Sequence, residues 1–244
     1  MVDQKEGASR KESRQVSTRS AGRPRIGGSE LASKRAIVLS AVGKLLAERH
    51  SSDITVQHLI QTVGTSRPTF YRWFPGGVEQ AVEMLIIQAN DELVTRIFGV
   101  LVNATSIEER IKMAIRAYFD WCVDQGPVAY GIYREGFDES SPAWRYRRKT
   151  IDTVVQLMTA QAKTMGLTGV TTLSIETMVS WIESAGMVLC RHYPVNKEDA
   201  DAQNTLTTDM FLATFASLKW EILNKTPNSS IANKNHSHIW PITF

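Results

Sequence analysis

Hydrophobic positions recur with helical spacing through most of the chain. From Ser33 to about His50, apolar residues appear at i, i+3 and i+4, which predicts an amphipathic helix. The same spacing predicts two short helices after it, one beginning near Thr55 and one near Ser66, and longer helices in the remainder. We find no convincing run that alternates apolar and polar residues with β-branched enrichment between turn signals, so a sheet is not expected. The pattern predicts an all-α protein.

Capping and turn residues mark the ends of the two short helices. Thr55 is a predicted N-cap, and Gly64 can take the positive φ that a tight helix-to-helix turn requires. Ser66 is the predicted N-cap of the next helix, with Pro68 in its first turn, where the missing N–H loses no intrahelical partner. Pro-Gly-Gly at 75–77 should end this helix. A longer helix followed by two such short ones is the layout of a three-helix helix-turn-helix domain.

Helix-capping and helix-starting residues in the rest of the chain predict a larger helical domain. Ser106 and Glu109 have the S-x-x-E spacing of a capping box, and Ser141-Pro142 has the form of another helix start. We therefore predict a disordered basic arm at 1–32, a helix-turn-helix domain at 33–80, a helical effector-binding and dimerisation domain at 81–225 and a flexible tail at 226–244.

Charge is distributed unevenly along the 244 residues. Formal net charge is +3, but residues 1–35 hold nine Lys or Arg against four acids, which gives +5 and leaves 3 − 5 = −2 for the remainder. A basic, apolar-poor arm before a slightly acidic body favours attraction to a polyanion. The alternative is a solvated disordered tail with no partner.

Apolar content and cysteine positions bear on the compartment. An apolar fraction of 43% supports a substantial core. The polar amino terminus has no secretory apolar region, and no apolar run approaches the ~18 residues of a membrane span. Cys122 and Cys190 lie far apart in apolar helical patterns, which favours plain buried thiols. We expect a cytoplasmic protein that does not enter a membrane.

The stretch TSRPTFYRWF at 65–74 holds several side chains of the types that contact bases and phosphates in the major groove of DNA. A helical wheel places Phe70 and Phe74 on one side, toward the core. The exposed face then offers arginines for guanine edges or phosphates, small groups for a thymine methyl, a phenolic hydroxyl and helix N-terminal amides for phosphate. The residues concerned are Arg67, Arg72, Pro68, Thr69, Tyr71, Thr55 and Ser66. The alternative is a helical hairpin with an aromatic core and two solvated arginines.

The pattern ITVQHLIQTVGTSRPTFYRWF resembles the DNA-binding domain of the tetracycline-repressor (TetR) family over roughly residues 34–85. The resemblance implies that Arg67, Pro68, Thr69 and Arg72 read bases and that Thr55, Tyr71 and Trp73 contact the DNA backbone. Such proteins usually open the fourth helix with a lysine that contacts phosphate, whereas residues 75–78 here read Pro-Gly-Gly-Val. The glycine amides ahead of that helix are candidates for an uncharged phosphate nest in its place, and the sequence does not decide whether a phosphate contact is kept.

Two arginines in the arm extend this hypothesis. Arg23 and Arg25, in AGRPRIGG, resemble short arginine arms that enter an A·T-rich minor groove. An ordinary basic linker is the alternative.

The resemblance also implies that the larger domain forms a dimer, commonly through its last two long helices, and encloses a small-molecule effector. Large aromatic and soft side chains in the middle helices could line a pocket for a small hydrophobic molecule. Core packing is the alternative for each of them. The pocket candidates are Met113, Tyr118, Trp121, Tyr130, Tyr133, Phe137, Trp144, Met158 and Trp181. The pair Arg134-Glu135 and the basic run at 145–149 are interpreted as solvated faces.

The sequence therefore favours a dimeric transcriptional regulator, a repressor of palindromic operator DNA that a small hydrophobic effector releases. The alternative is a helical adaptor that binds protein without sequence-specific DNA binding. An enzyme is disfavoured, because GxGxxG, P-loop, HExxH and GxSxG motifs are absent and the five histidines offer only an isolated H-x-H, His236 and His238, in the tail. We predict no catalytic residue, metal site or cofactor.

Overall fold

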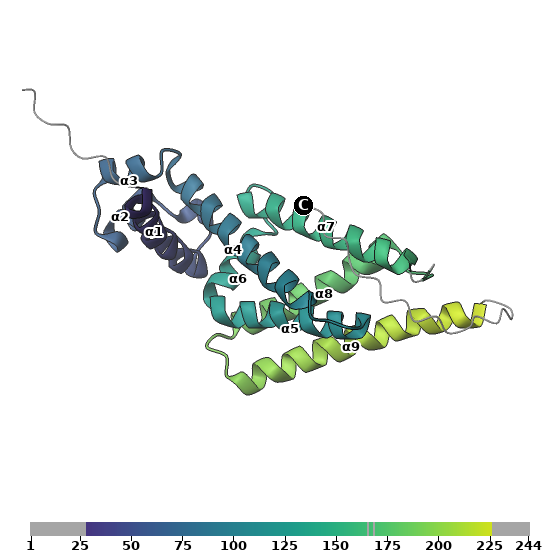
Figure 1. The fold of residues 1–244 in the computed structure, drawn as a ribbon. Coiled ribbons are helices and arrows are strands. Elements are labelled where there is room, and N and C mark those ends of the chain that lie inside the picture. Colours follow the sequence, from purple (N-terminus) through teal and green to yellow (C-terminus); the bar gives the residue numbers. More distant parts are fainter. Residues whose placement is uncertain (1–27, 165, 168, 226–244) are drawn as a thin grey trace, which may run out of the picture.

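The computed structural model describes residues 28–164, 166–167 and 169–225, and within these ranges all regular structure is helical (Figure 1). The predicted all-α class is confirmed. Most of the predicted arm, including Arg23 and Arg25, and the tail at 226–244 lie outside the described residues. The helices are α1 (Gly28–Glu48), α2 (Val56–Val63), α3 (Arg67–Trp73), α4 (Gly77–Leu101), α5 (Ile107–Gln125), α6 (Pro127–Glu135), α7 (Pro142–Thr164), α8 (Thr172–Arg191) and α9 (Lys197–Lys225), with a 3₁₀ turn at Ser51–Asp53.

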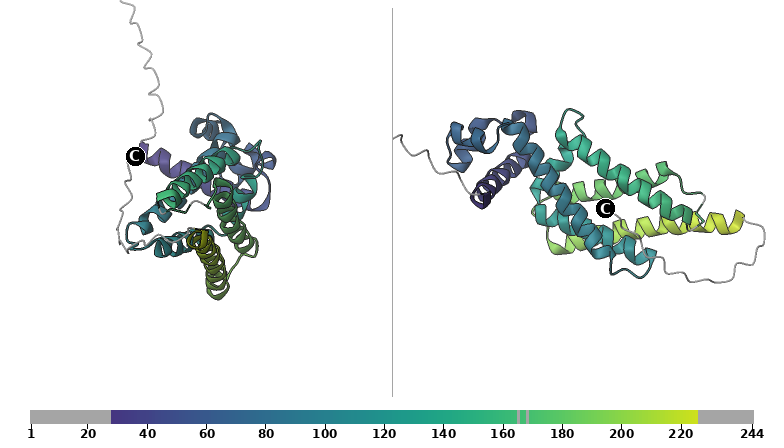
Figure 2. Two further views of the ribbon diagram at one scale, coloured as in Figure 1. Left: turned by 90° about the vertical axis from the view of Figure 1, so that its right-hand side faces the viewer. Right: turned by 45° about the horizontal axis from the view of Figure 1, so that its top comes forward.

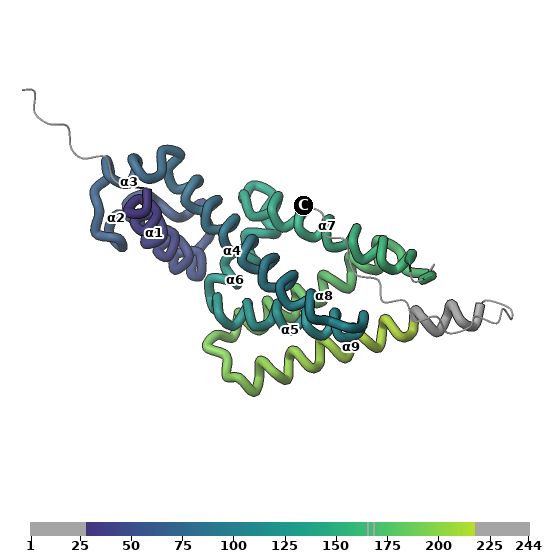
Figure 3. The backbone as a smooth tube through the Cα atoms, viewed as in Figure 1, coloured from purple at the N-terminus to yellow at the C-terminus, as the bar shows by residue number. Residues whose placement is uncertain are grey.

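Helices α1 to α3 form a small unit at one end of the molecule, and α4 runs from it into the larger helical body as one continuous helix (Figures 1 and 3). The small unit has its own core, which buries side chains of α1, α2 and α3 against the first turns of α4. Its most deeply buried large residues include Val38, Leu46, Leu59, Phe70 and Phe74.

Helix α1 begins at Gly28, earlier than the predicted boundary at residue 33. Only Leu31 of this extra turn is half-buried against the core, so a single apolar position there gives little hydrophobic spacing to read. Local polar contacts stabilise it instead: Ser33 Oγ donates to the Ser29 carbonyl at 3.1 Å, and Glu30 places a negative charge in the first turn, where the helix dipole favours it.

The predicted caps of the two short helices are confirmed. The Thr55 hydroxyl accepts from His58 N at 3.2 Å, and the Ser66 hydroxyl accepts from Thr69 N at 3.4 Å. Gly64 has φ +68°, a left-handed conformation that glycine adopts without a Cβ clash. These local signals fix where α2 ends and where α3 begins.

The predicted capping box at the start of α5 is only half formed. The Ser106 hydroxyl accepts from Glu109 N at 3.1 Å, as expected. The Glu109 carboxylate, however, accepts from the backbone and hydroxyl of Thr105, both at 2.7 Å, rather than from the Ser106 amide. The carboxylate therefore orders the residue before the cap.

The larger unit surrounds α5, which packs against α4, α8 and α9. Its core is centred on Tyr118, Phe119, Trp121 and Cys122 of that helix. Helix α9 lies along an outer side of this unit, beside α5 and α8 (Figure 2). Cys122 and Cys190 are free and buried, as predicted, and the Cys190 thiol donates to the Cys122 carbonyl at 3.6 Å.

Helix α8 is long and apolar enough, by length and composition, to cross a membrane, with a mean hydropathy of 1.2 over its most apolar window. The sequence pattern did not indicate such a segment. In the structure α8 packs against α5, α6, α7 and α9, as a helix of a bundle does. Several of its apolar side chains nevertheless remain exposed, Leu173 and Val188 among them.

Candidate nucleic-acid interface and ligand cavities

An aromatic core fixes the orientation of α3. Phe70 and Phe74 are fully buried and stack with ring centroids 5.5 Å apart. The Arg35 guanidinium of α1 donates to the Trp73 carbonyl at 2.9 Å and lies over the Phe74 ring. The inner face of α3 is therefore held by both packing and a hydrogen bond, as the predicted placement of the two phenylalanines requires.

The outer face of α3 presents two arginines that make no polar contact with the rest of the described chain. Arg67, Pro68 and Arg72 are exposed, and Tyr71 is 43% exposed and makes a T-shaped contact with Phe70. Neither arginine makes a hydrogen bond or ion pair with another described residue. This face can therefore offer two guanidinium groups and a phenol to a polyanion without breaking an internal contact.

The hydroxyl residues at the helix starts are already engaged in capping. Ser66 Oγ lies 2.9 Å from Thr69 Oγ1, to which it donates, and Thr69 is half-buried. Thr55 is exposed, and its backbone amide donates to His58 Nδ1 at 3.2 Å.

One prediction about the DNA face is corrected. Trp73 is 6% exposed and belongs to the core of the small unit, so its indole cannot contact a DNA backbone from this position. The glycine amides that were candidates for a phosphate nest are also already occupied: Gly76 N donates to the Gln80 side chain at 3.0 Å and Gly77 N to the Phe74 carbonyl at 2.9 Å.

The larger unit contains an inner cavity of about 100 Å³ among α4, α5, α6, α7 and α8. Three of the nine predicted pocket residues line it, namely Tyr118, Trp121 and Tyr133. The Trp121 Nε1 donor is buried and has no hydrogen-bond partner among the described residues. The cavity is thus lined mainly by apolar side chains, and one of its lining residues carries a donor without a partner.

An ion pair closes part of the inner cavity. The Arg147 guanidinium donates to the two Glu183 carboxylate oxygens at 3.1 and 2.7 Å and lies 4.1 Å from the Phe137 ring centroid. Burial raises the pKa of Glu183, and Arg147 offsets that rise only in part. Burial also raises the pKa of Tyr133 to about 12, so its hydroxyl is neutral at physiological pH.

An outer cavity of about 400 Å³ lies between α4, α5 and α7 and is lined almost wholly by apolar side chains. Met158 is the only predicted pocket residue that lines it. Met113 instead lines a polar groove of about 420 Å³ between α5 and α9.

Gly186 of α8 approaches Tyr118 so closely that a Cβ there would meet the phenol ring.

The nine predicted pocket residues do not form one cluster. Phe137 is 57% exposed and Trp181 is 45% exposed, and neither lines a cavity described above. Trp144 is 36% exposed, and Tyr130 packs beneath the Arg134 guanidinium. Aromatic content identified the right helices, but it could not tell which face of each helix points inward.

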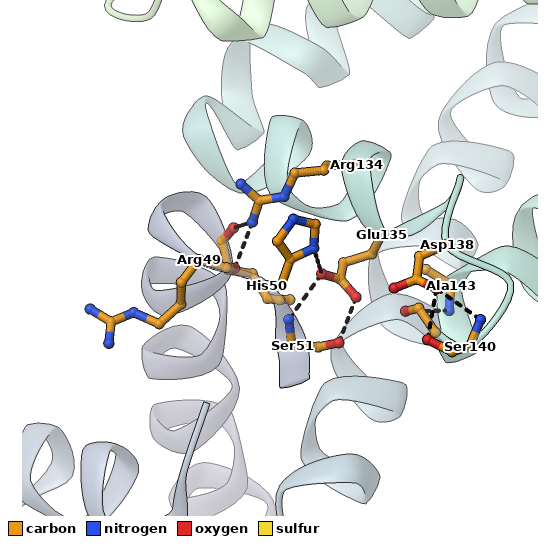
Figure 4. Close-up of polar contacts among 10 residues, drawn as sticks. Arg49, His50, Ser51, Arg134, Glu135, Asp138, Ser140 and Ala143 are labelled. Atoms are coloured by element: carbon orange, nitrogen blue, oxygen red, sulfur yellow. Dashed lines mark hydrogen bonds and ion pairs between the residues drawn. The ribbon is translucent and has the colours of Figure 1, made fainter. Parts of the chain in front are cut away.

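A polar junction between α1 and α6 was missed (Figure 4). Glu135 was expected on a solvated face, yet its side chain is fully buried and accepts from Ser51 N at 2.9 Å and Ser51 Oγ at 2.6 Å. His50 Nδ1 lies 3.4 Å from the same carboxylate. The partners lie 84 residues apart in sequence, so no local pattern could reveal them.

The same junction holds the last turn of α1 by its carbonyls. The Arg134 guanidinium donates to the carbonyls of Leu46 at 3.0 Å and Arg49 at 2.6 Å (Figure 4). Gly131 packs directly on the Leu46 carbonyl, where any Cβ would collide with backbone. Helices α1 and α6 therefore meet backbone to backbone.

Among the described residues, no group of three His, Cys, Asp or Glu side chains could hold a metal ion.

No protein-family model and no curated protein matches this sequence. Solved structures do match. A tetR-family transcriptional regulator from Streptomyces coelicolor has a TM-score of 0.54 at 20% identity, covering 80% of this chain and 90% of its own. The fatty acid degradation regulator FadR from Bacillus halodurans has a TM-score of 0.62 at 16% identity, covering 73% and 94%. A TetR-family regulator from Rhodococcus sp. has a TM-score of 0.58 at 16% identity, covering 73% and 98%.

These similarities span both the small unit and the larger helical body. At such low identity they establish the architecture, and they agree with the resemblance of the TSRPTFYRWF region. The described chain has the fold of TetR-family transcriptional regulators.

Proposed function

We propose that this protein is a dimeric, cytoplasmic transcriptional repressor that binds palindromic operator DNA and is released by a small, mainly apolar effector. The observation that carries the proposal is the exposed α3 face, where Arg67 and Arg72 have no partner among the described residues. Arginine is the residue most often used to read guanine edges in the major groove. An aromatic core behind α3 supplies the rigid support that base reading needs.

Exposed apolar residues on α8 and α9 support a dimer. Trp181 and Val188 lie two helical turns apart on α8 and are 45% and 48% exposed. Leu206 and Met210 lie one turn apart on α9 and are 56% and 52% exposed. Exposed apolar patches of this kind commonly mark protein interfaces. Pairing these faces in two copies would form a four-helix bundle and present two α3 helices to two half-sites.

Helix α6 supports a route from effector to DNA. Three of its residues, Ala129, Ile132 and Tyr133, line the inner cavity, and so does its C-cap residue Gly136. The residues between them reach the end of α1, as the contacts of Gly131 and Glu135 show. A ligand that displaces α6 would therefore move the small unit. Release requires only that the two α3 helices leave the one-turn separation of about 34–36 Å.

Selection of bound sites from random duplex DNA tests the proposal, and we expect a palindrome. Affinity for the selected site should fall steeply with salt, because phosphate contacts release counterions. Replacing both α3 arginines, Arg67→Ala and Arg72→Ala, should reduce affinity by about 2–6 kcal/mol and flatten the salt slope, while the free energy of unfolding stays within about 0.5 kcal/mol.

Lys163→Ala is the matched control, because it removes an exposed cation from the far end of α7. It should leave both DNA affinity and its salt slope unchanged. A folded wild-type protein with no salt-dependent DNA binding would instead favour the protein-binding adaptor.

A further inference from the structure

The inner and outer cavities adjoin. Leu93 of α4 and Thr150 of α7 line both of them, so the two cavities share a wall at these residues. At this wall, Thr150 Oγ1 donates to Asn90 Oδ1 at 2.9 Å. A single molecule that moves these side chains apart could extend from one cavity into the other.

The outer cavity has the chemistry of a site for an apolar chain. Apart from Arg110 and Thr150, its lining is apolar throughout. Ile97 and Phe98 of α4, Ile111 of α5 and Leu157 of α7 contribute to its wall. At about 400 Å³ it lies within the usual range for small-molecule sites. It can shield an unbranched hydrocarbon chain from water.

The inner cavity has the chemistry of a site for an uncharged acceptor. Its lining includes Trp121, which is 94% buried with an unpartnered Nε1 donor, and Asn90, whose Nδ2 makes no hydrogen bond with a described residue. The cation in its wall, Arg147, already forms a two-bond pair with Glu183. A carboxylate would have to displace Glu183, whereas a carbonyl oxygen could accept from a free donor.

We propose that one elongated, uncharged molecule occupies both cavities, with a straight apolar tail in the outer cavity and a carbonyl-type acceptor beside Trp121 in the inner cavity. This assignment of the effector class rests on the proposed function for its regulatory meaning. The binding itself can be tested without DNA.

The probe is a homologous series of straight-chain methyl ketones from butanone upward, titrated calorimetrically into the full chain. Each added methylene should raise affinity about fourfold until the outer cavity is filled. Fatty acids of matching length should bind more weakly, because the inner cavity offers no unpaired cation. The two series thus report on the tail and the head separately.

Variants assign the two ends. Val154→Trp, which fills the outer cavity, should abolish the gain from chain length while short ketones bind as before; Leu157→Phe is a milder second variant. Thr153→Trp is the matched control, because this neighbouring residue on α7 is exposed and lines neither cavity. Trp121→Phe should weaken every ketone roughly fivefold and leave hydrocarbons of the same length unaffected.

The proposal is overturned if affinity is independent of chain length or if the filling variants leave that dependence intact. If fatty acids bind more tightly than ketones of matching length, and Arg110→Met abolishes that difference, the head assignment is overturned. Failure of the proposed function gives a different result, since a protein that binds ketones as expected but selects no DNA sequence remains a ligand-binding protein without an operator. Operator binding that persists without any ketone binding would overturn only the ligand class.

Discussion

Helices α3 and α6 are both short, and they use their polar side chains in opposite ways. On α3, Arg67 and Arg72 are exposed and have no partner among the described residues. On α6, Arg134 and Glu135 are committed to the last turn of α1 and the segment directly after it through four hydrogen bonds. Polar residues on α3 should therefore govern binding with little effect on stability, whereas those on α6 should govern stability and the placement of the small unit.

The largest expected effect on stability is that of Glu135→Ala. The substitution leaves the Ser51 amide without its acceptor and removes two hydrogen bonds to a buried carboxylate. We expect a loss of about 3 kcal/mol in the free energy of unfolding, measured by urea denaturation. Glu139→Ala, which removes an exposed carboxylate nearby, should change stability by less than about 0.5 kcal/mol. Equal effects of the two substitutions would contradict the claim that the polar residues of α6 govern stability.

A smaller effect is expected from Gly131→Ala. The new methyl group must push α6 away from the Leu46 carbonyl, which should cost about 2 kcal/mol in unfolding free energy and alter operator affinity as well. Gly99→Ala is the matched control, because no atom lies within 4 Å of a Cβ built there, and alanine should stabilise that helix slightly. Wild-type operator affinity in a folded Gly131→Ala protein would argue against α6 as the route from cavity to DNA.

On the α3 side, Ser66→Ala removes the N-cap hydroxyl while leaving the arginine face in place. We expect a loss of about 1 kcal/mol in stability, as for other N-caps. Thr65→Ala, one residue earlier and outside the cap, provides the comparison in the same urea experiment. A loss as large as that of Glu135→Ala would show that α3 depends on its polar residues more than its packing suggests.

The smallest effect concerns acid. Burial alone would raise the pKa of Glu135, but hydrogen bonds from Ser51, together with Ser141 and His50, hold its pKa below the ordinary value. The unfolded chain therefore binds this proton more readily, and stability falls as pH decreases below about 4.3. Comparing the acid slope of unfolding free energy with that of Glu135→Gln isolates the contribution. Identical slopes would contradict it.

The sequence predicted those features that depend on neighbouring residues. Thr55, Gly64, Ser66 and Pro68 act within one helical turn, so the layout of the small unit was readable without a structure. Trp73 was misassigned because the resemblance gave it a role at the DNA backbone, whereas packing into the core of the small unit buries its ring.

Features that depend on distant partners escaped prediction. The burial of Glu135 requires Ser51, and the inner cavity takes Arg147 and Glu183 from α7 and α8. Tyr118, Trp121 and Tyr133 were identified because aromatic content marks apolar helices. Their neighbours Asn90 and Leu93 carry no compositional signal.

The close approach of Gly186 to Tyr118 has a consequence for assembly. Tyr118 forms part of the inner cavity wall, and Gly186 lies on α8, whose other face carries exposed Trp181 and Val188. A filled cavity would press on the back of the helix that we expect at the subunit contact. Ligand occupancy and subunit association should then be thermodynamically linked, so that ligand would shift the dissociation constant of the dimer and dilution to monomer would shift ligand affinity by the same factor.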